Sequence, residues 1–315
     1  MRRFPKRNQR GDHIGSHAPL VRLGQGDFTR DIHPEDLAMP ARTAHHDEQL
    51  DLRFLTREPA EVYHAKAMDY LSSHWLAEFR RCPLLYRRKR LGLILRREST
   101  AFLVGRAAHT LILEGRDRYE AEFAVGGPIN PKTGKPFGSG TKAFAEWAER
   151  LGKPVLSDDQ AAVIEQMAAS VKAHIFASEL LAVGQAEGVV RREYAGHACQ
   201  VRLDWINPIA GRGLVDLKTT DELDSFEFSI RAFGYVHQLA FYRALIAEAI
   251  GVTLQVHIIA VEKREPFRCG VWVICAKVLD AAQRENEQAM AELSECERRG
   301  HWPTGFESLR KFDRL

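Results

Sequence analysis

Three charged side chains lie in two neighbouring strand-like segments near the middle of the chain. Asp216 and Lys218 stand two residues apart in the segment 213–219, so their side chains would share one face of a sheet. Asp204 lies in the preceding segment, 199–206, and only a turn that contains proline and glycine separates the two segments. An antiparallel hairpin would therefore bring Asp204 and Asp216 close together.

Two acids and a lysine in this arrangement could hydrolyse a phosphate ester. Carboxylates that lie close together repel each other unless a cation or a shared proton intervenes. Oxygen ligands of this kind suit Mg²⁺ or Mn²⁺, and a nearby lysine can hold the attacking water or stabilise charge on a phosphate. A structural salt bridge is the alternative interpretation, because roughly one Asp-x-Lys tripeptide is expected by chance in a chain of this length.

A histidine in an earlier segment could join this group. A helix capped by Ser99 or Thr100 would run through AFLVGRAAHTLILEG and place Gly105 and His109 on one stripe. Glycine inside a helix costs about 1 kcal/mol relative to alanine, and it is tolerated where something packs closely on that face. A histidine on an apolar helix face is more often a hydrogen-bonded core residue than a ligand, so both interpretations stay open for His109.

These residues and their order resemble the signature of the PD-(D/E)xK nucleases, and most closely the nuclease domains of the exodeoxyribonuclease VIII (RecE) type. Asp204 and then Asp216-x-Lys218 match the signature, although Leu203 stands where its first half has proline. The resemblance extends over about residues 60 to 305. Further matching stretches are Y-H-A at 63–65, Cys82-Pro83, G-R-A-A-H ending at His109, G-Y-V-H-Q-L-A-F-Y from Gly234 to Tyr242, Val261-Glu262-Lys263 and His301-Trp302-Pro303.

The resemblance implies a role for each matching residue. The metal ligands would be His109, Asp204, Asp216 and the carbonyl of Leu217, and Lys218 would be the catalytic lysine. Gln238 and Tyr242 would line the site and support Lys218 or the DNA. Their spacing of four residues also puts them on one helix face without reference to the family, while core packing is the alternative for Tyr242 and Tyr235. Glu193 could be a secondary acid, although a solvated strand residue is the simpler interpretation.

The resemblance also implies an activity. It indicates a Mg²⁺-dependent (or Mn²⁺-dependent) deoxyribonuclease, and specifically an exonuclease that degrades linear duplex DNA from 5′ to 3′ and leaves single strands for recombination and annealing. Such enzymes form rings or other oligomers and work with a single-strand annealing protein, so both are expected partners. A RecB-like nuclease of other polarity, an endonuclease and a non-catalytic DNA-binding module remain alternatives; the intact His109, Asp204, Asp216 and Lys218 argue against the last.

The cysteines do not suggest a disulfide framework, because there are five of them at irregular spacings. They indicate a reduced, cytoplasmic setting. Some relatives hold an iron–sulfur cluster with one early and three late cysteines, a count that Cys82, Cys269, Cys275 and Cys296 match. We expect no cluster, because Cys269 and Cys275 would lie in one strand, roughly 20 Å apart.

A basic segment near the start of the ordered chain is a candidate DNA-binding surface. Phosphate contacts come from lysines and arginines clustered on one face. A solvated helix face is an equally good interpretation of this segment. The candidate residues, with Tyr86 among them, are Arg80, Arg81, Arg87, Arg88 and Arg90.

The bulk composition sets limits on these interpretations. The 315 residues include 45 Lys and Arg against 42 Asp and Glu, so DNA binding must rest on local clusters. No apolar run approaches the roughly 20 residues of a membrane helix, and no membrane contact is expected. Residues 1–48 are rich in Gly, Pro, His and charge and are expected to be a basic, disordered leader. Residues 49–315 would form the nuclease domain.

The elements that must position the site form a mixed pattern of helices and strands. We expect helices at 73–81, from Pro83, at 101–115, up to Arg150, from the Ser157 capping box to about 177, at 224–250 and at 277–299. Strands are expected at 189–194, 199–206, 213–219, 254–262 and 268–275. A long loop with three lysines covers 126–142. This order predicts an α/β (α+β) fold with a mixed central sheet flanked by helices, and the resemblance implies a restriction-endonuclease-like core.

Overall fold

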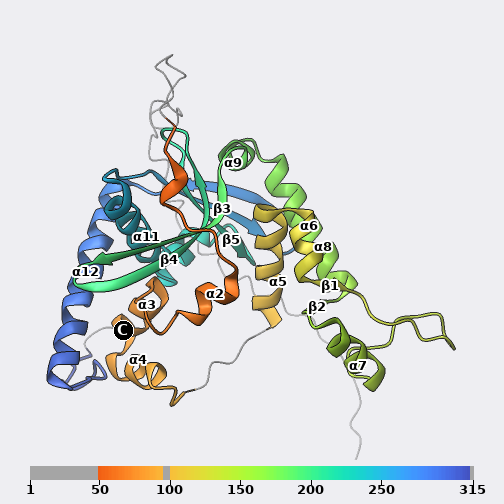
Figure 1. Ribbon diagram of the computed structural model, residues 1–315, viewed down its shortest axis with the longest axis horizontal. Helices are drawn as coiled ribbons and strands as arrows, with labels where there is room; N and C mark the ends of the chain where they lie inside the picture. Colours follow the sequence, from red (N-terminus) through yellow and green to blue (C-terminus); the bar gives the residue numbers. More distant parts are fainter. Residues whose placement is uncertain (1–48, 95–99, 313–315) are drawn as a thin grey trace, which may run out of the picture. The chain divides into compact units, whose positions relative to one another are not determined.

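The computed structural model of the protein describes residues 49–94 and 100–312 (Figure 1). The expected leader, residues 1–48, and the capping residue Ser99 lie outside the described part of the chain. The described helical elements are η1 (Leu52–Phe54), α2 (Ala60–Ala65), α3 (Ser73–Arg81), α4 (Pro83–Arg90), α5 (Thr100–His109), the π-helical turn η2 (Thr110–Glu114), α6 (Arg116–Glu122), α7 (Lys142–Leu151), α8 (Asp158–Ala173), α9 (Ile175–Leu181), α10 (Phe226–Ala232), α11 (Tyr235–Ile250) and α12 (Ala276–Arg299).

A five-stranded mixed sheet runs through the described residues in the order β3-β4-β5-β6-β7. Its strands are β3 (Gln185–Tyr194), β4 (His197–Asn207), β5 (Gly213–Thr220), β6 (Val256–Glu262) and β7 (Cys269–Val273). Neighbouring strands are antiparallel except for β5 and β6, which are parallel. Parallel neighbours need a long crossover, and the chain from α10 through α11 supplies it. The predicted mixed sheet and the predicted β4–β5 hairpin are both confirmed.

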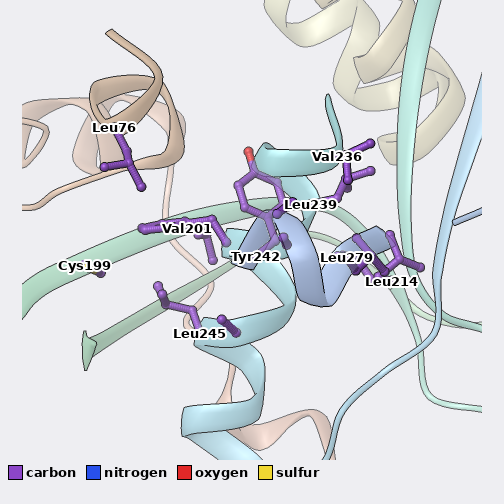
Figure 2. Close-up of a cluster of buried hydrophobic side chains, with 14 of the residues drawn as sticks. Leu76, Cys199, Val201, Leu214, Val236, Leu239, Tyr242, Leu245 and Leu279 are labelled. Carbon is purple, nitrogen blue, oxygen red and sulfur yellow. The ribbon is translucent and has the colours of Figure 1, made fainter. Parts of the chain in front are cut away.

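Helices cover both faces of this sheet, so two hydrophobic cores form (Figure 1). The first core lies between the sheet and α3, α11 and α12, and the second between the sheet and α5, α8 and α9. Figure 2 shows Leu214 of β5 and Leu239 of α11 in the first core. Val215 and Leu217 lie in the second core. The alternation of side chains predicted for β5 is therefore confirmed, and the α/β fold class with it.

Two of the predicted helices are each divided in the structure. The helix expected at 224–250 ends at Ala232, and α11 starts after Gly234, whose φ of 68° is a left-handed value that favours glycine. The helix expected to reach 177 ends at Ala173, and His174 caps α9 by accepting a hydrogen bond from the amide of Ala177. Neither break contains a proline, and helical periodicity continues across both.

Strand boundaries also differ from the prediction. β3 begins at Gln185, four residues earlier than expected, and β7 ends at Val273. Cys275 therefore lies outside the strand and precedes α12, so the two cysteines Cys269 and Cys275 do not share one extended segment as predicted. None of the helices in residues 49–94 and 100–312 is long and apolar enough to cross a membrane.

A small second sheet was not predicted. It consists of two parallel strands, β1 (Ala124–Val125) and β2 (Val155–Leu156). Strands of two residues are too short to show the period-two pattern that identifies a strand in a sequence. Between them the chain forms a loop and then α7. We call residues 124–156 the arm.

Candidate active site

The two strands that carry the acids separate where the acids lie. β4 and β5 pair at Trp205–Val215, Ile206–Leu214 and Asn207–Gly213, next to their connecting turn. Beyond these pairs the backbone amide of Leu217 donates instead to the Oδ2 atom of Asp204, over 2.8 Å. A side-chain carboxylate thus takes the place of a backbone carbonyl in the ladder. This bond fixes Asp204 at the point where the strands open.

β3, which neighbours β4 on its other side, is also irregular opposite Asp204. β3 and β4 pair on either side of Glu187 and Asp204 but not at these two residues. Glu187 has a φ of 57°, which is uncommon for a residue other than glycine, and such strained residues cluster at functional sites. Its carboxylate lies 2.5 Å from the guanidinium of Arg202, and burial, followed by the charge of Asp204, raises the pKa of Glu187 well above its usual range.

Asp216 is the most deeply buried acid of the site. Its residue surface is 1% exposed, and burial raises the pKa of its carboxyl group to about 6 although Lys218 opposes that shift. The ammonium of Lys218 lies 2.5 Å from Oδ2. Among the described residues, however, no donor makes a well-directed hydrogen bond to either carboxylate oxygen of Asp216. A buried carboxylate is costly unless a positive charge, here that of Lys218, or a bound metal ion compensates it.

Lys218 contacts both an aromatic ring and an acid. Its Nζ atom lies 4.8 Å from the ring centroid of Tyr235 and 2.5 Å from Oδ2 of Asp216. Burial disfavours the charge of Lys218, but Asp216 and Asp204 together outweigh that effect and raise its pKa above the ordinary value. Lys218 therefore stays protonated at neutral pH, as a donor and a positive charge.

Gln238 and Tyr242 lie on α11 above the same strands. The amide of Gln238 donates to the hydroxyl of Tyr242 over 2.8 Å. The ring of Tyr242 belongs to the first core (Figure 2), and burial, followed by the charge of Asp216, raises its pKa. Gln238 lines the pocket described below. The core-packing interpretation thus holds for the ring of Tyr242, while its hydroxyl accepts from Gln238, which lines the pocket.

His109 completes the group from the opposite helix. It is the last residue of α5, directly before the π-helical turn, and its Nδ1 atom lies 3.5 Å from Oδ2 of Asp204. Single π-helical turns inside helices are frequent at functional sites. Burial, followed by the charge of Lys218, lowers the pKa of His109 to about 4. The imidazole is therefore neutral at pH 7, the form in which histidine binds metals.

Part of this group lines a pocket of about 830 Å³, whereas Asp204, Asp216 and Tyr242 are not among its lining residues. His109, Leu217, Lys218 and Gln238 line it, and so does Glu187, which sequence reasoning missed. No pattern in the sequence marks Glu187, because its strained backbone conformation follows from the tertiary fold. Glu193, the secondary acid considered above, is exposed near the other end of β3 and does not line the pocket.

The donor atoms of the site fit a hard divalent cation. Two carboxylates and a neutral imidazole converge from β4, β5 and α5, and the oxygens of Asp216 have no well-directed hydrogen bond, although the Lys218 ammonium lies beside Oδ2. No three histidine, cysteine, aspartate or glutamate side chains of the described residues are arranged to enclose a metal ion by themselves. In this conformation Lys218 balances the charge of Asp216, and Asp204 is bonded to Leu217. A cation here would also need oxygen donors other than side chains.

The predicted DNA-binding arginines are largely engaged in contacts within the protein. Arg80 bonds Glu285, Arg90 donates to the carbonyls of Ala67 and Met68, and Arg87 stacks on the ring of Trp302. Arg81 and Arg88 are exposed. DNA binding by these five arginines stays a prediction, and the contacts favour a structural role for Arg90 in particular.

The sequence matches the family described as PDDEXK-like domain of unknown function (DUF3799), over residues 72–311. The chain belongs to this family. Membership in the PDDEXK-like family confirms the resemblance to PD-(D/E)xK nucleases that Asp204, Asp216 and Lys218 indicated, while the RecE-type branch stays a prediction.

Among solved structures, this PDDEXK-like chain is similar to the "Putative exonuclease" from Eubacterium rectale, with a TM-score of 0.57 and 16% sequence identity. The similarity covers 82% of this chain and 97% of that chain. At this identity it shows a shared fold. None of the curated proteins matches this chain.

Proposed function

We propose that the protein is a Mg²⁺- or Mn²⁺-dependent DNA exonuclease, which degrades linear duplex DNA from 5′ to 3′ and leaves single strands for recombination. The observation that carries the proposal is the buried carboxylate of Asp216, whose oxygens have no well-directed hydrogen bond. It lies beside Lys218 and near the contact between Asp204 and His109. Membership in the PDDEXK-like family supports a nuclease. The similarity to a "Putative exonuclease" supports action at DNA ends.

Each residue of the candidate active site would have a distinct role in the reaction. Asp204, Asp216 and the neutral His109 would hold the cation, with the Leu217 carbonyl as a further oxygen donor. A bound divalent cation would neutralise charge on the scissile phosphate and lower the pKa of a water molecule. Lys218 stays protonated beside them, so it can donate to a phosphate oxygen or orient the attacking water. Gln238 and Tyr242 would contact the DNA or steady Lys218 from α11.

The direct test compares linear duplex DNA, labelled at the 5′ or the 3′ end, with covalently closed circular DNA. With Mg²⁺ or Mn²⁺ we expect the linear substrate to lose its 5′ label first, the circle to stay intact, and EDTA to stop the reaction. Cleavage of the circle would favour an endonuclease, and early loss of the 3′ label a RecB-like polarity. DNA binding without cleavage under any of these conditions would favour a non-catalytic module.

Two partners complete the proposal: a second copy of the chain and a single-strand annealing protein. Both rest on the RecE-type resemblance. Size-exclusion chromatography with light scattering would measure the number of subunits. Co-elution with a purified single-strand annealing protein would test the second partner.

A further inference from the structure

The arm has an ordered loop at its end. Its tip is a short hairpin in which Asn130 donates from its backbone amide to the carbonyl of Lys135 over 2.8 Å, and its side chain accepts from the amide of Lys132 over 2.9 Å. Ile129 and Pro136 form an antiparallel bridge below this tip. Gly127 packs against the ring of Phe144 on α7. The loop therefore presents its lysines from a defined backbone.

All charged side chains of this loop are positive. Residues 126–142 contain three lysines, Lys132, Lys135 and Lys142, and no aspartate or glutamate. Lys132 and Lys135 lie at the hairpin tip and are exposed, and neither forms an ion pair with a carboxylate of the described residues. Lys142 lies 3.6 Å from Glu146 of α7. An exposed, purely basic tip is chemically complementary to a polyanion.

The base of the arm is part of the wall of the active-site pocket. Phe123 and Pro154, which directly precede β1 and β2, both line the pocket. Arg106 of α5 lines it as well, and its guanidinium lies 5.4 Å from the ring centroid of Phe123. The wall of the pocket next to the arm thus carries the positive charge of Arg106, while the acids Glu114, Glu122 and Glu187 also line the pocket. A backbone that enters the pocket can pass along this side.

The arm contributes little to the two hydrophobic cores. No residue of α7 is buried, and Phe144 and Trp147 pack against each other outside both cores. At the base, Lys153 donates to the carbonyl of Glu120 over 2.6 Å and so ties the arm to the end of α6. An element that is fixed at its base and carries only basic groups at its tip is better explained by binding than by folding.

We propose that the hairpin tip of the arm, with Lys132 and Lys135, binds the phosphate backbone of the DNA outside the active-site pocket. This inference rests on the proposed function, because the pocket must accept DNA for the arm to extend its binding site. The lysines act as unspecific backbone contacts. They hold the duplex while Lys218 and the acids act at the strand within the pocket.

The test compares two double variants that each remove two positive charges, Lys132→Ala/Lys135→Ala in the arm and Lys172→Ala/Lys277→Ala on α8 and α12. DNA affinity is measured by fluorescence anisotropy on a linear duplex in EDTA over a range of salt concentrations. We expect the arm variant to bind about 10- to 30-fold more weakly and the slope of log K against log salt to become shallower by about 2. The control variant should resemble the wild type.

Steady-state kinetics distinguish a role of the arm in DNA binding from a role in catalysis. With Mg²⁺, the arm variant should show a raised KM for long duplex DNA and an unchanged kcat. Equal DNA affinity and an equal salt slope in the two variants would overturn the role of the arm. A change in subunit number confined to the arm variant would overturn it as well, because it would assign the tip to self-association. If the wild type itself binds no DNA, the proposed function fails and the inference with it.

Discussion

At the residue scale, the site depends on a few side chains that replace ordinary backbone contacts. Asp204 accepts the hydrogen bond that a carbonyl would accept in a continuous ladder, and Asp216 is buried beside Lys218. The alternation of side chains along a strand and the short turn between β4 and β5 were sufficient to predict that Asp204, Asp216 and Lys218 lie close together. Glu187 could not be predicted in the same way, because its left-handed backbone lies in a segment whose composition gives no sign of it.

Tyr235 is expected to position Lys218. Its ring face lies 4.8 Å from the ammonium, and a cation–π contact of this kind is worth about 1 kcal/mol. Tyr235→Leu should therefore lower kcat about fivefold with little change in KM, whereas Tyr235→Phe keeps the ring and should stay near the wild-type rate. Steady-state kinetics on linear duplex DNA measures both. Equal losses in the two variants would show that the hydroxyl group, and not the ring, is what matters.

At the element scale, local sequence signals identified most helices and strands, but not where they break. Gly234 starts α11 in a left-handed conformation and so places Tyr235 over Lys218. Helical periodicity runs through Gly234, so the sequence alone favoured one long helix. The short pair β1–β2 forms only because the ends of the arm come together in space, and such pairing has no local signal.

Substitution by alanine should have different effects on stability at two glycines, one in β5 and one in α5. Gly213 opens β5 with a φ of 52°, and an added Cβ would lie 2.4 Å from the carbonyl oxygen of Gln255. Gly213→Ala should therefore cost about 3 kcal/mol in the free energy of unfolding. Gly105, in contrast, has a helical backbone, and its added Cβ would lie 3.6 Å from Thr219, an ordinary contact distance.

Gly105→Ala should accordingly leave stability unchanged or raise it by up to about 1 kcal/mol. The close packing expected at Gly105 from the sequence is thus looser than predicted. Urea unfolding of the two variants beside the wild type measures the difference. Similar losses of stability in both variants would contradict the difference in packing between the two glycines.

At the scale of the whole molecule, the fold class followed from the order of the elements, because helices alternate with short strands that must pair. The order of the strands and the assignment of helices to the two faces could not be predicted from that order. β6 is buried on both faces, and its apolar run VHIIAV fits a strand with helices on either side. Which helices cover it depends on contacts between distant segments.

Glu262 should make stability depend on pH on the acidic side. It accepts hydrogen bonds from Arg268 and from the amide of Leu223, and these lower its pKa to about 2 from an ordinary 4.5. Because the folded-state pKa is depressed, its stabilisation is complete above about pH 4.5 and is lost as the pH falls towards 2. Glu262→Gln should cost about 2 kcal/mol at pH 7.

Unfolding of the wild type and of Glu262→Gln by urea, at several pH values from 7 down to 3.5, checks this expectation. The difference in stability between the two proteins should be constant above pH 5 and shrink below 4.5. A difference that stays constant throughout would mean that the charge of Glu262 does not contribute.

The central claim is that Asp204, Asp216, His109 and Lys218 form one hydrolytic centre. Its most direct test is the rate at which Asp216→Asn degrades end-labelled linear duplex DNA in Mg²⁺, with the thermal unfolding of the variant as the measure of its fold. The account predicts a folded protein whose rate falls by at least about a thousandfold. A folded Asp216→Asn protein that degrades DNA at the wild-type rate would contradict it.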